Sequence, residues 1–294
     1  MSASSLHLSA PAKLNLHLSV VGRRPDGYHL LDGVMVKLDL ADELTLALSG
    51  PGLELTVSGL AAPAGRQNLV FQAAEAFYAA TGFAEQATFR LKKCIPMAAG
   101  LGGGSSDAAA ALTGLNRLYG SPLGEEALAA LGLKLGADVP FFLSPWVAAR
   151  SQGIGEVLSP GPEVPATWLF LLVNPGWPLS TAWVFKNLRL GLTTSPKGLI
   201  NSALNAGSFA IDRLLYNDLE SVVLPRFPEV KAIREQLLAC GASGALMTGS
   251  GPTVFGIFTR RDRLQRAGTV LKEFSHGKWV VLETRRLPSP QPGA

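Results

Sequence analysis

A glycine- and serine-rich segment near residue 100 has the composition of a phosphate-binding loop. The segment Pro96-Met-Ala-Ala-Gly-Leu-Gly-Gly-Gly-Ser-Ser106 lies between a predicted strand and a predicted helix, and four of the five residues 100–104 are glycine. Because each glycine costs backbone entropy on folding, so many of them indicate that the backbone must approach a ligand closely. The helix is expected to begin at about Ser105 or Ser106, and its free N–H groups and dipole favour an anion. The segment therefore predicts a phosphate site.

Two well-known glycine motifs do not fit this segment. No Gly-Lys-Ser/Thr follows it, so it is not a P-loop, and Ser105 stands where the dinucleotide fingerprint requires its third glycine. The hydroxyls of Ser105 and Ser106 can cap the helix, bond phosphate oxygens or help to hold Mg²⁺. The plainer alternative is a tight loop before a serine-capped helix, with Asp107 in the cap region. Four glycines followed by paired serines favour phosphate binding over that alternative.

Three polar residues elsewhere in the chain could do the chemistry at such a site. Lys13 and Asn15 alternate with Leu14, Leu16 and Leu18 in a strand pattern, so the two polar side chains share one face. Asp138 lies in a turn within an apolar stretch, where a charge is costly unless it has a partner. A strand-start lysine is usually solvated, however, and an aspartate before proline usually caps a turn. These residue types alone leave both interpretations open.

Other segments have candidate binding residues with plain structural alternatives. Tyr28-His29 follows a glycine turn and could be a half-buried edge, and Phe185 could equally belong to the core. Gly249-Ser-Gly-Pro252 is typical of a turn between two strands. Lys92 and Lys93, just before the glycine segment, are expected to have solvated side chains.

Strand and helix patterns follow one another without the regular spacing of βαβ units. Strands are expected at 12–19, 34–40, 44–48, 87–92, 168–173 and 278–283, with 34–48 forming a hairpin that turns at Ala41-Asp42. Helices are expected at 68–80 with Asn68 as the N-cap, and from the glycine segment to about 119. Two more are expected at 228–239 and at 262–274, the last with Asp262 as the N-cap. These patterns predict an α+β fold. A proline- and glycine-rich stretch at 158–165 predicts two domains, residues 1–162 and 163–294.

The composition is that of an ordinary folded protein and excludes several classes. Of 294 residues, 47% are hydrophobic and 16% charged, which excludes a disordered chain. The most apolar stretch, Trp168–Val173, is far shorter than the ~20 residues of a membrane span, and the first residues do not resemble an export signal. The net charge of +4 comes from scattered basic residues, so nucleic-acid binding is not expected. Cys94 and Cys240 are two lone cysteines without metal-ligand spacing, as expected of a reduced cytoplasmic protein. The sequence does not reveal the oligomeric state.

Three collinear motifs resemble the GHMP kinases, the family of galactokinase, homoserine kinase, mevalonate kinase and phosphomevalonate kinase. Pro11-Ala-Lys-Leu-Asn15 resembles the first family motif, the glycine segment the second, and Met247-Thr-Gly-Ser-Gly-Pro-Thr253 the third. The blocks Arg24-Pro-Asp-Gly-Tyr-His29 and Leu135-Gly-Ala-Asp-Val-Pro140 are similar to the branch of the family that acts on a cytidine-diphosphate-linked sugar alcohol in non-mevalonate isoprenoid synthesis. The resemblance covers almost the whole chain.

The resemblance implies a fold and a role for each candidate residue. The fold has a ribosomal-protein-S5-like N-terminal domain and a ferredoxin-like C-terminal domain, with the active site between them. Asp138 matches the catalytic base and Lys13 the catalytic lysine, and ATP with Mg²⁺ would be used without a dedicated protein cage for the metal. ATP binding is assigned to Pro96, Met97, Ala98, Ala99, Gly100, Leu101, Gly102, Gly103, Gly104, Ser105 and Ser106. Binding of the cytidine diphosphate substrate is assigned to Asn15, Tyr28, His29, Phe185, Gly249 and Ser250.

The sequence departs from the family pattern at a few positions, and particular residues disfavour the competing functions. The family often has more glycine where Met97-Ala-Ala99 stands, so we expect these residues to need no positive φ. Another acceptor, such as homoserine or mevalonate, is disfavoured by the Gly-Tyr-His and Gly-Ala-Asp-Val-Pro blocks. A nucleotide sensor without catalysis is disfavoured because Lys13 and Asp138 are both present. A Rossmann dehydrogenase is disfavoured, because this sequence has neither the third glycine of the dinucleotide fingerprint nor an acidic residue at a strand end at the expected distance.

Overall fold

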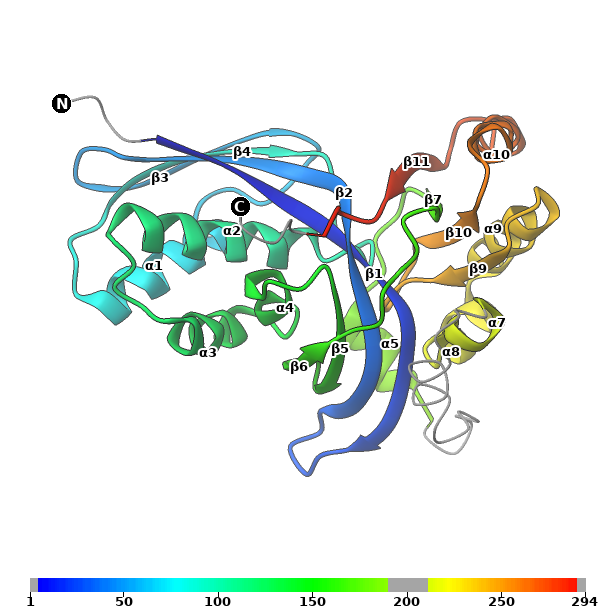
Figure 1. Ribbon diagram of the computed structural model, residues 1–294, viewed down its shortest axis with the longest axis horizontal. Coiled ribbons are helices and arrows are strands. Elements are labelled where there is room, and N and C mark those ends of the chain that lie inside the picture. Colours follow the sequence, from blue (N-terminus) through cyan, green and yellow to red (C-terminus); the bar gives the residue numbers. More distant parts are fainter. Residues whose placement is uncertain (1–4, 190–210, 290–294) are drawn as a thin grey trace. The chain divides into compact units, whose positions relative to one another are not determined.

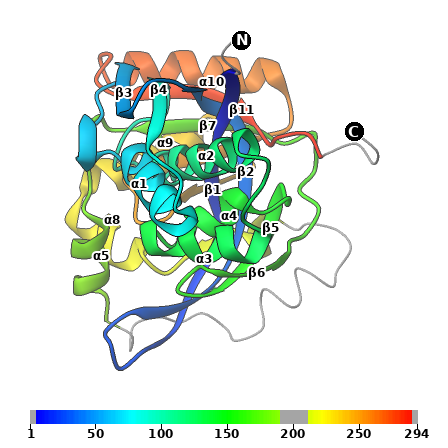
Figure 2. The same ribbon diagram turned by 90° about the vertical axis from the view of Figure 1, so that its left-hand side faces the viewer.

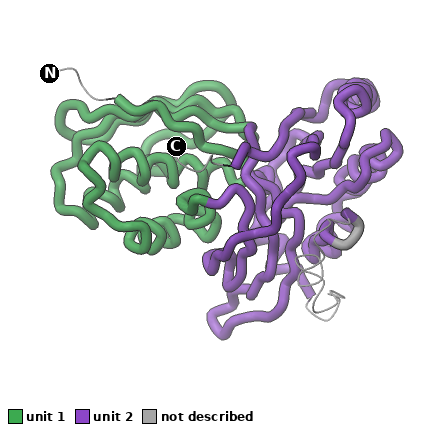
Figure 3. The backbone as a smooth tube through the Cα atoms, in the orientation of Figure 1, with its two compact units in different colours: residues 1–12, 40–97, 102–145 green, residues 13–39, 98–101, 146–294 purple. Residues whose placement is uncertain are grey.

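The computed structural model describes residues 5–189 and 211–289. They fall into two compact units, drawn in green and purple in Figure 3. Unit 1 comprises residues 1–12, 40–97 and 102–145, and unit 2 comprises residues 13–39, 98–101 and 146–294. The units are not contiguous in sequence because the long strands β1 (Ser5–Arg23) and β2 (His29–Leu48) each contribute to both. The division into residues 1–162 and 163–294 stays a prediction.

Unit 1 combines a β-sheet with helices packed on one face. Strand β3 (Gly52–Gly59) pairs in parallel with β4 (Gln86–Lys93), and β4 pairs antiparallel with the last part of β2. Figures 1 and 2 show α1 and α2 side by side along these strands. The helices are α1 (Leu69–Thr81), α2 (Gly103–Leu118), α3 (Glu125–Leu135) and α4 (Val139–Leu143), with a 3₁₀ turn at Gly65–Gln67. Leu46, Phe77, Phe89 and Leu112 are fully buried between sheet and helices, so burial of apolar surface stabilises this unit.

Unit 2 contains an antiparallel sheet with helices against it. Within the described part of the chain, its strand order is β11-β7-β10-β9. The bounds are β7 (Leu169–Asn174), β9 (Gly244–Met247), β10 (Val254–Phe258) and β11 (Val280–Arg285). Helices α9 (Pro228–Ala239) and α10 (Arg261–Phe274) contribute Ile233 and Leu271 to the core that also contains Leu171 of β7.

A second group of strands in unit 2 includes the remaining parts of β1 and β2. β1 pairs in parallel with β8 (Tyr216–Asn217), β2 pairs antiparallel with β5 (Ala148–Gly153), and β5 pairs with β6 (Val157–Pro160). The other helices of unit 2 are α5 (Thr181–Asn187), α7 (Ile211–Leu214) and α8 (Glu220–Arg226). No helix of the described ranges is long and apolar enough to cross a membrane.

Several predicted elements are confirmed, and their ends follow the local chemistry. Helix α1 begins after Asn68, whose Oδ1 accepts a hydrogen bond from the Val70 N–H at 2.9 Å, and it ends at Gly82, which has a φ of 73°. Helix α9 begins at Pro228, where the missing N–H costs nothing. β4, β7 and β11, and the strands on both sides of the 249–252 turn, also lie where the patterns predict them.

The predicted hairpin within residues 34–48 is wrong. These residues belong to one continuous strand, β2, and Asp42 is fully buried in it rather than placed in a turn. The Asp42 carboxylate accepts hydrogen bonds from the Cys94 N–H at 2.5 Å and the Ile95 N–H at 2.9 Å, and it pairs with Lys93. Because these partners compensate its desolvation, the acid fits inside the sheet.

Two helices begin earlier than their sequence signals predict. Helix α2 begins at Gly103, not Ser105 or Ser106, because Gly102 takes the left-handed conformation with a φ of 71° and ends the loop there. Helix α10 begins at Arg261 with Arg260 in the cap position, so Asp262 is not the cap. Asp262 instead forms ion pairs with Arg260 and Arg266.

Candidate active site

The first half of the glycine segment contacts strand β1 in unit 2. The Lys13 N–H donates to the Leu101 carbonyl at 2.9 Å, which ties residues 98–101 to the strand that contains Lys13 and Asn15. The Leu179 N–H donates to the Ala98 carbonyl at 3.4 Å. Ala98 has a φ of 47°, contrary to the expectation that the alanines need no positive φ. Ala98 therefore holds a backbone conformation that favours glycine.

Lys13 and Asn15 form a buried polar pair on β1. Lys13 Nζ donates to Asn15 Oδ1 at 2.5 Å, and the two residues are 4% and 6% exposed. The strand alternation placed both side chains on one face, and the structure brings them together. Leu14, Leu16 and Leu18 are also buried, so both faces of this strand are covered. A charged group in such surroundings needs compensating partners. Lys13 is therefore a buried residue of the candidate site and not a solvated surface lysine.

The Gly249–Ser250 turn lies against this pair. Gly249 has a φ of 56°, and a Cβ added to it would lie 3.2 Å from Lys13 Nζ and 3.3 Å from Asn15 Oδ1. Only glycine fits this close approach without strain. Ser250 Oγ hydrogen-bonds to Thr181 Oγ1 at 2.7 Å, which links the turn to α5. The structure thus brings Gly249 together with Lys13 and Asn15.

Thr248 connects these parts and was not singled out from the sequence. Its Oγ1 accepts a hydrogen bond from the Asn15 N–H at 3.0 Å and donates one to the Gly100 carbonyl at 3.4 Å. One hydroxyl therefore joins β1 to the glycine segment. Thr248 lies within the third family motif, but no periodicity indicates its contacts, because its partners are 148 and 233 positions away.

The second half of the glycine segment forms the start of α2 in unit 1. A Cβ added to Gly103 would lie 3.0 Å from Ile95 Cγ2, so a larger residue there would crowd the Ile95 side chain just after β4. Ser106 is buried, and its Oγ has no hydrogen-bond partner among the described residues. Buried hydroxyls are normally paired. An unpaired hydroxyl in the first turn of a helix suits a phosphate oxygen or a metal-bound oxygen. Pro96 and Met97 precede this half in unit 1, and Met97 is 47% exposed.

Asp138 also belongs to unit 1, at the start of α4. It is the residue before the helix, it is partly exposed, and its turn is adjacent to the glycine segment. A Cβ added to Gly136 would lie 3.5 Å from Ser105 Oγ. Lys13 belongs to unit 2, and the roles of Asp138 as base and Lys13 as catalytic lysine stay predictions.

A buried ionic cluster beneath the second half of the segment corrects the expectation for Lys93. Lys92 is exposed and pairs with Glu43 at 3.1 Å, but Lys93 is only 4% exposed and its Nζ contacts Asp107 Oδ2 at 2.6 Å and Asp42 Oδ2. Asp107 is likewise a buried partner of Lys93 within α2 and not a cap-region residue. Strand alternation was the available signal, because Lys93 continues the buried series Ala87, Phe89 and Leu91.

Replacing Asp107 by Asn tests the cost of this buried charge. Desolvation outweighs the opposing effect of Lys93 and raises the pKa of Asp107 to about 7. An unfolded aspartate titrates near ~3.9. The folded protein therefore holds the Asp107 proton more tightly than the unfolded chain does. The contribution of Asp107 to stability is complete below about pH 4 and is lost as the pH rises through about 7. We expect the melting temperature of the unsubstituted protein to fall relative to that of Asp107→Asn between about pH 4 and 7. Thermal unfolding followed by circular dichroism measures this, and a difference independent of pH would contradict it.

Three aromatic residues assigned to the cytidine diphosphate substrate, Tyr28, His29 and Phe185, lie in unit 2. The His29 and Phe185 rings stack, with centroids 5.3 Å apart and planes 28° from parallel. Tyr28 is 60% exposed, so its ring is available to a ligand. Partial burial, and secondarily the positive charge of Arg23, lower the pKa of His29, which favours the neutral imidazole. A neutral imidazole offers one donor and one acceptor.

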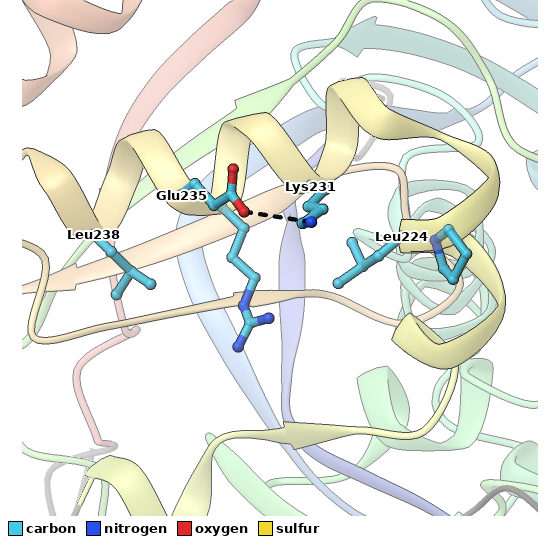
Figure 4. A pocket seen from close by; sticks show the side chains of 6 residues that line it. Leu224, Lys231, Glu235 and Leu238 are labelled. Carbon is cyan, nitrogen blue, oxygen red and sulfur yellow. Dashed lines mark ion pairs between the residues drawn. The ribbon is translucent and has the colours of Figure 1, made fainter.

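A shallow pocket of about 450 Å³ lies elsewhere in unit 2, between α8 and α9. Its lining residues are Leu224, Pro225, Lys231, Arg234, Glu235 and Leu238. Figure 4 shows Lys231 and Glu235 facing each other on one helix, where their charged groups are 3.7 Å apart. None of the predicted site residues is among this lining.

Two family models and near-full-length relatives match the chain. "GHMP kinases N terminal domain" matches residues 68–145, and "GHMP kinases C terminal" matches residues 200–276. A Geobacter metallireducens protein is 44% identical over 284 residues, covering 96% of this chain and 99% of the relative. A Pelobacter propionicus protein is 46% identical over 283 residues, covering 95% and 99%. Both carry the name 4-diphosphocytidyl-2-C-methyl-D-erythritol kinase. The chain belongs to the GHMP kinase family.

Solved structures agree with this family assignment. A crystal structure of 4-(cytidine 5'-diphospho)-2C-methyl-D-erythritol kinase is 36% identical, with a TM-score of 0.79 over 95% of this chain and 99% of the other. A homoserine kinase structure from Cytophaga hutchinsonii is 20% identical, with a TM-score of 0.74 over 98% and 96%, and shows a likeness of fold alone. The predicted α+β GHMP kinase fold is confirmed. The phosphate donor of GHMP kinases is ATP, which excludes the dehydrogenase alternative.

Proposed function

We propose that this GHMP kinase transfers the γ-phosphoryl group of ATP to the 2-hydroxyl of 4-diphosphocytidyl-2-C-methyl-D-erythritol, a step of non-mevalonate isoprenoid synthesis. The observation that carries the proposal is the identity of 41% or more, over nearly the whole chain, with relatives that bear the name of this kinase. The buried Lys13–Asn15 pair beside the glycine segment supports it, because phosphoryl transfer needs a fixed positive group near the phosphates.

The proposed reaction is an in-line displacement at the γ-phosphorus. Asp138 accepts the proton of the acceptor hydroxyl, whose oxygen bonds to phosphorus while the bond to the β–γ bridging oxygen breaks and ADP leaves. Lys13 stabilises the negative charge that develops on the transferring group. Residues Pro96–Ser106 hold the ATP phosphates through backbone N–H groups and the start of α2. Asn15, Gly249 and Ser250 bind the erythritol and phosphate part of the acceptor.

The proposed reaction also uses Mg²⁺, which neutralises part of the charge on the phosphates when bound. The unpaired Ser106 Oγ at the start of α2 fits an oxygen ligand for it. The described residues contain no group of three or more His, Cys, Asp or Glu placed to hold a metal ion. Mg²⁺ usually keeps several waters and binds through substrate phosphates, so a single hydroxyl is compatible with it. Cytoplasmic location and the absence of nucleic-acid and membrane partners stay predictions.

Tyr28→Ala tests recognition of the cytosine ring. The exposed Tyr28 ring stacks on the base, while His29 supplies hydrogen bonds and Phe185 supports the His29 ring. Because base–aromatic stacking contributes about 1–3 kcal/mol, we expect Tyr28→Ala to weaken binding of cytidine diphosphate by that amount in calorimetric titration. Phe274→Ala removes another exposed ring, which belongs to α10 and is 51% exposed, and is the control. Unchanged affinity in Tyr28→Ala would refute this cytidine site.

A coupled ADP-release assay tests the proposed function as a whole. The cytidyl-erythritol compound, homoserine and mevalonate are compared at equal concentrations with saturating ATP and Mg²⁺. We expect ADP release that depends on the cytidyl compound and exceeds by far the release with the other two alcohols. Preference for homoserine or mevalonate would assign another GHMP activity. No acceptor-dependent release with any of them would favour a nucleotide-binding protein without catalysis.

A further inference from the structure

The Asn217 side chain holds the two carbonyl groups on either side of Thr248. Its Nδ2 donates to the Met247 carbonyl at 2.7 Å and to the Gly249 carbonyl at 2.8 Å, and Asn217 is 5% exposed. Its Oδ1 accepts from the Leu219 N–H at 3.0 Å. Both amide hydrogens are therefore used on one turn. Carbonyl oxygens can only accept, so the amide nitrogen must face the turn.

The turn held in this way is the one that connects the candidate site in unit 2. Thr248 Oγ1 bonds both the Asn15 N–H and the Gly100 carbonyl. Gly249 lies against Lys13 Nζ and Asn15 Oδ1. A shift of the 247–249 backbone would therefore displace the contacts of the lysine, of the asparagine and of the glycine segment together.

Asn217 is itself fixed on both sides. It lies in β8, which pairs in parallel with β1 through His17↔Tyr216 and Leu18↔Asn217. The neighbouring Asp218 accepts a hydrogen bond from the Val20 N–H of β1 at 2.6 Å. Glu220, in the same segment, accepts from the Met247 N–H of β9 at 2.9 Å. Residues 216–220 thus connect β1 directly to the end of β9, and a rigid anchor of this kind is what a positioned side chain needs.

We propose that Asn217 is a positioning residue of the phosphoryl-transfer site, whose two donated hydrogen bonds set the Thr248–Gly249 turn against Lys13, Asn15 and Gly100. The role rests on the proposed function. Asn217 acts through the turn, so its loss displaces the groups that stabilise the transition state. A misplacement of about 1 Å can cost roughly 10²-fold in rate. The loss is expected to be larger in kcat than in KM, although Asn15 and Gly249 also bind the acceptor.

Asn217→Asp removes both N–H donors of the side chain. It keeps the size of the side chain and the oxygen that accepts the hydrogen bond from the Leu219 N–H. At about pH 8 its carboxylate faces two carbonyl oxygens, and we expect kcat to fall roughly 10- to 100-fold, with KM for ATP and for the cytidyl acceptor changing less than about threefold. Burial raises the pKa of a carboxyl group. Lowering the pH toward protonation of this carboxyl group therefore restores an O–H donor, and kcat of Asn217→Asp relative to Asn217→Ala is expected to rise as the pH falls. Charged or titratable groups contact the neighbouring residues and are common to both variants. Glu220 accepts from the Met247 N–H and pairs with Arg234, Lys13 lies near Gly249, Asp218 follows Asn217, and His17 is opposite Tyr216.

Asn116→Asp is the matched control. Asn116 is a buried asparagine of unit 1 that donates to the Leu123 carbonyl at 2.9 Å and accepts from the Leu123 N–H at 3.0 Å, away from the site residues. It should lower the melting temperature without lowering kcat at a temperature where it is folded. If Asn217→Asp does not fold, Thr248→Val carries the test, because it removes the hydroxyl through which the turn acts and should lower kcat similarly.

The outcomes separate this role from a merely structural one. A kcat within threefold of the unsubstituted protein in the folded Asn217 variants, or in Thr248→Val when it is used, would overturn the positioning role. An equal kcat loss in Asn116→Asp, a loss confined to KM, or an Asn217→Asp to Asn217→Ala ratio that does not change with pH would also overturn it. Failure of the unsubstituted protein to phosphorylate the cytidyl compound would instead contradict the proposed function. The two failures are therefore distinguishable.

Discussion

Asp138→Asn is expected to lower kcat by roughly 10²- to 10⁴-fold while leaving ATP affinity nearly unchanged, because a general base contributes about that much to a proton transfer. Asparagine has the shape of aspartate but cannot take up the proton of the acceptor hydroxyl. Asp138 lies before α4, in the turn whose Gly136 approaches Ser105. The substitution therefore changes the chemistry at a position next to the glycine segment.

Steady-state ADP release gives kcat for this variant, and calorimetric titration with a non-hydrolysable ATP analogue gives its affinity. Asp262→Asn is the control for the same acid-to-amide change. Asp262 is an exposed acid on α10 that pairs with Arg260 and Arg266, and exposed ion pairs contribute little to stability. It should keep full activity. Near-normal turnover in Asp138→Asn would remove this residue from the role of base.

Lys13→Met is expected to lower kcat by roughly 10²- to 10³-fold, the size of the effect when one electrostatic stabiliser of a transition state is removed. Methionine keeps much of the length and the apolar stem of lysine but has no charge. Lys13 Nζ is held by Asn15 Oδ1 at 2.5 Å and lies close to Gly249, so its position is fixed before the substrate binds. Preorganisation of this kind makes the charge effective in the transition state.

The same two measurements apply to Lys13→Met, with Lys272→Met as the control. Lys272 is an exposed lysine in the last turn of α10. The affinity for the ATP analogue should change less than kcat. A variant that binds the analogue much more weakly but turns over normally at saturation would make Lys13 a binding residue rather than a catalytic one.

The part of the site that could be predicted from the sequence is the part encoded by neighbouring residues. Alternation in 12–19 placed Lys13 and Asn15 on one face of a strand, and the glycines marked a loop before a helix. Both signals are local, because a strand repeats every two residues and a glycine loop needs only its own backbone. Helices α1 and α9 were predicted for the same reason, α1 from its Asn68 cap and α9 from Pro228 at its first position.

What the sequence did not reveal depends on partners far along the chain. Asp42 was predicted to lie in a hairpin turn, but Lys93, 51 positions away, compensates its charge inside the sheet. Thr248 joins Asn15 to Gly100 across 233 and 148 positions, and Asn217 reaches Met247 and Gly249 in the same way. Such contacts form only when strands pair in three dimensions. Local propensity and periodicity therefore contain no information about them.

We propose that the γ-phosphoryl group of ATP moves to the cytidyl-erythritol acceptor, and phosphorus NMR of the reaction mixture follows that group directly. With Mg²⁺, ATP and the cytidyl compound, we expect the γ-phosphate signal to be replaced by a phosphomonoester signal on the acceptor while the acceptor's diphosphate signals persist. The Asp138→Asn mixture should show almost none of the new signal over the same time. Formation of inorganic phosphate alone, or of a monoester on homoserine or mevalonate but not on the cytidyl compound, would contradict the claim.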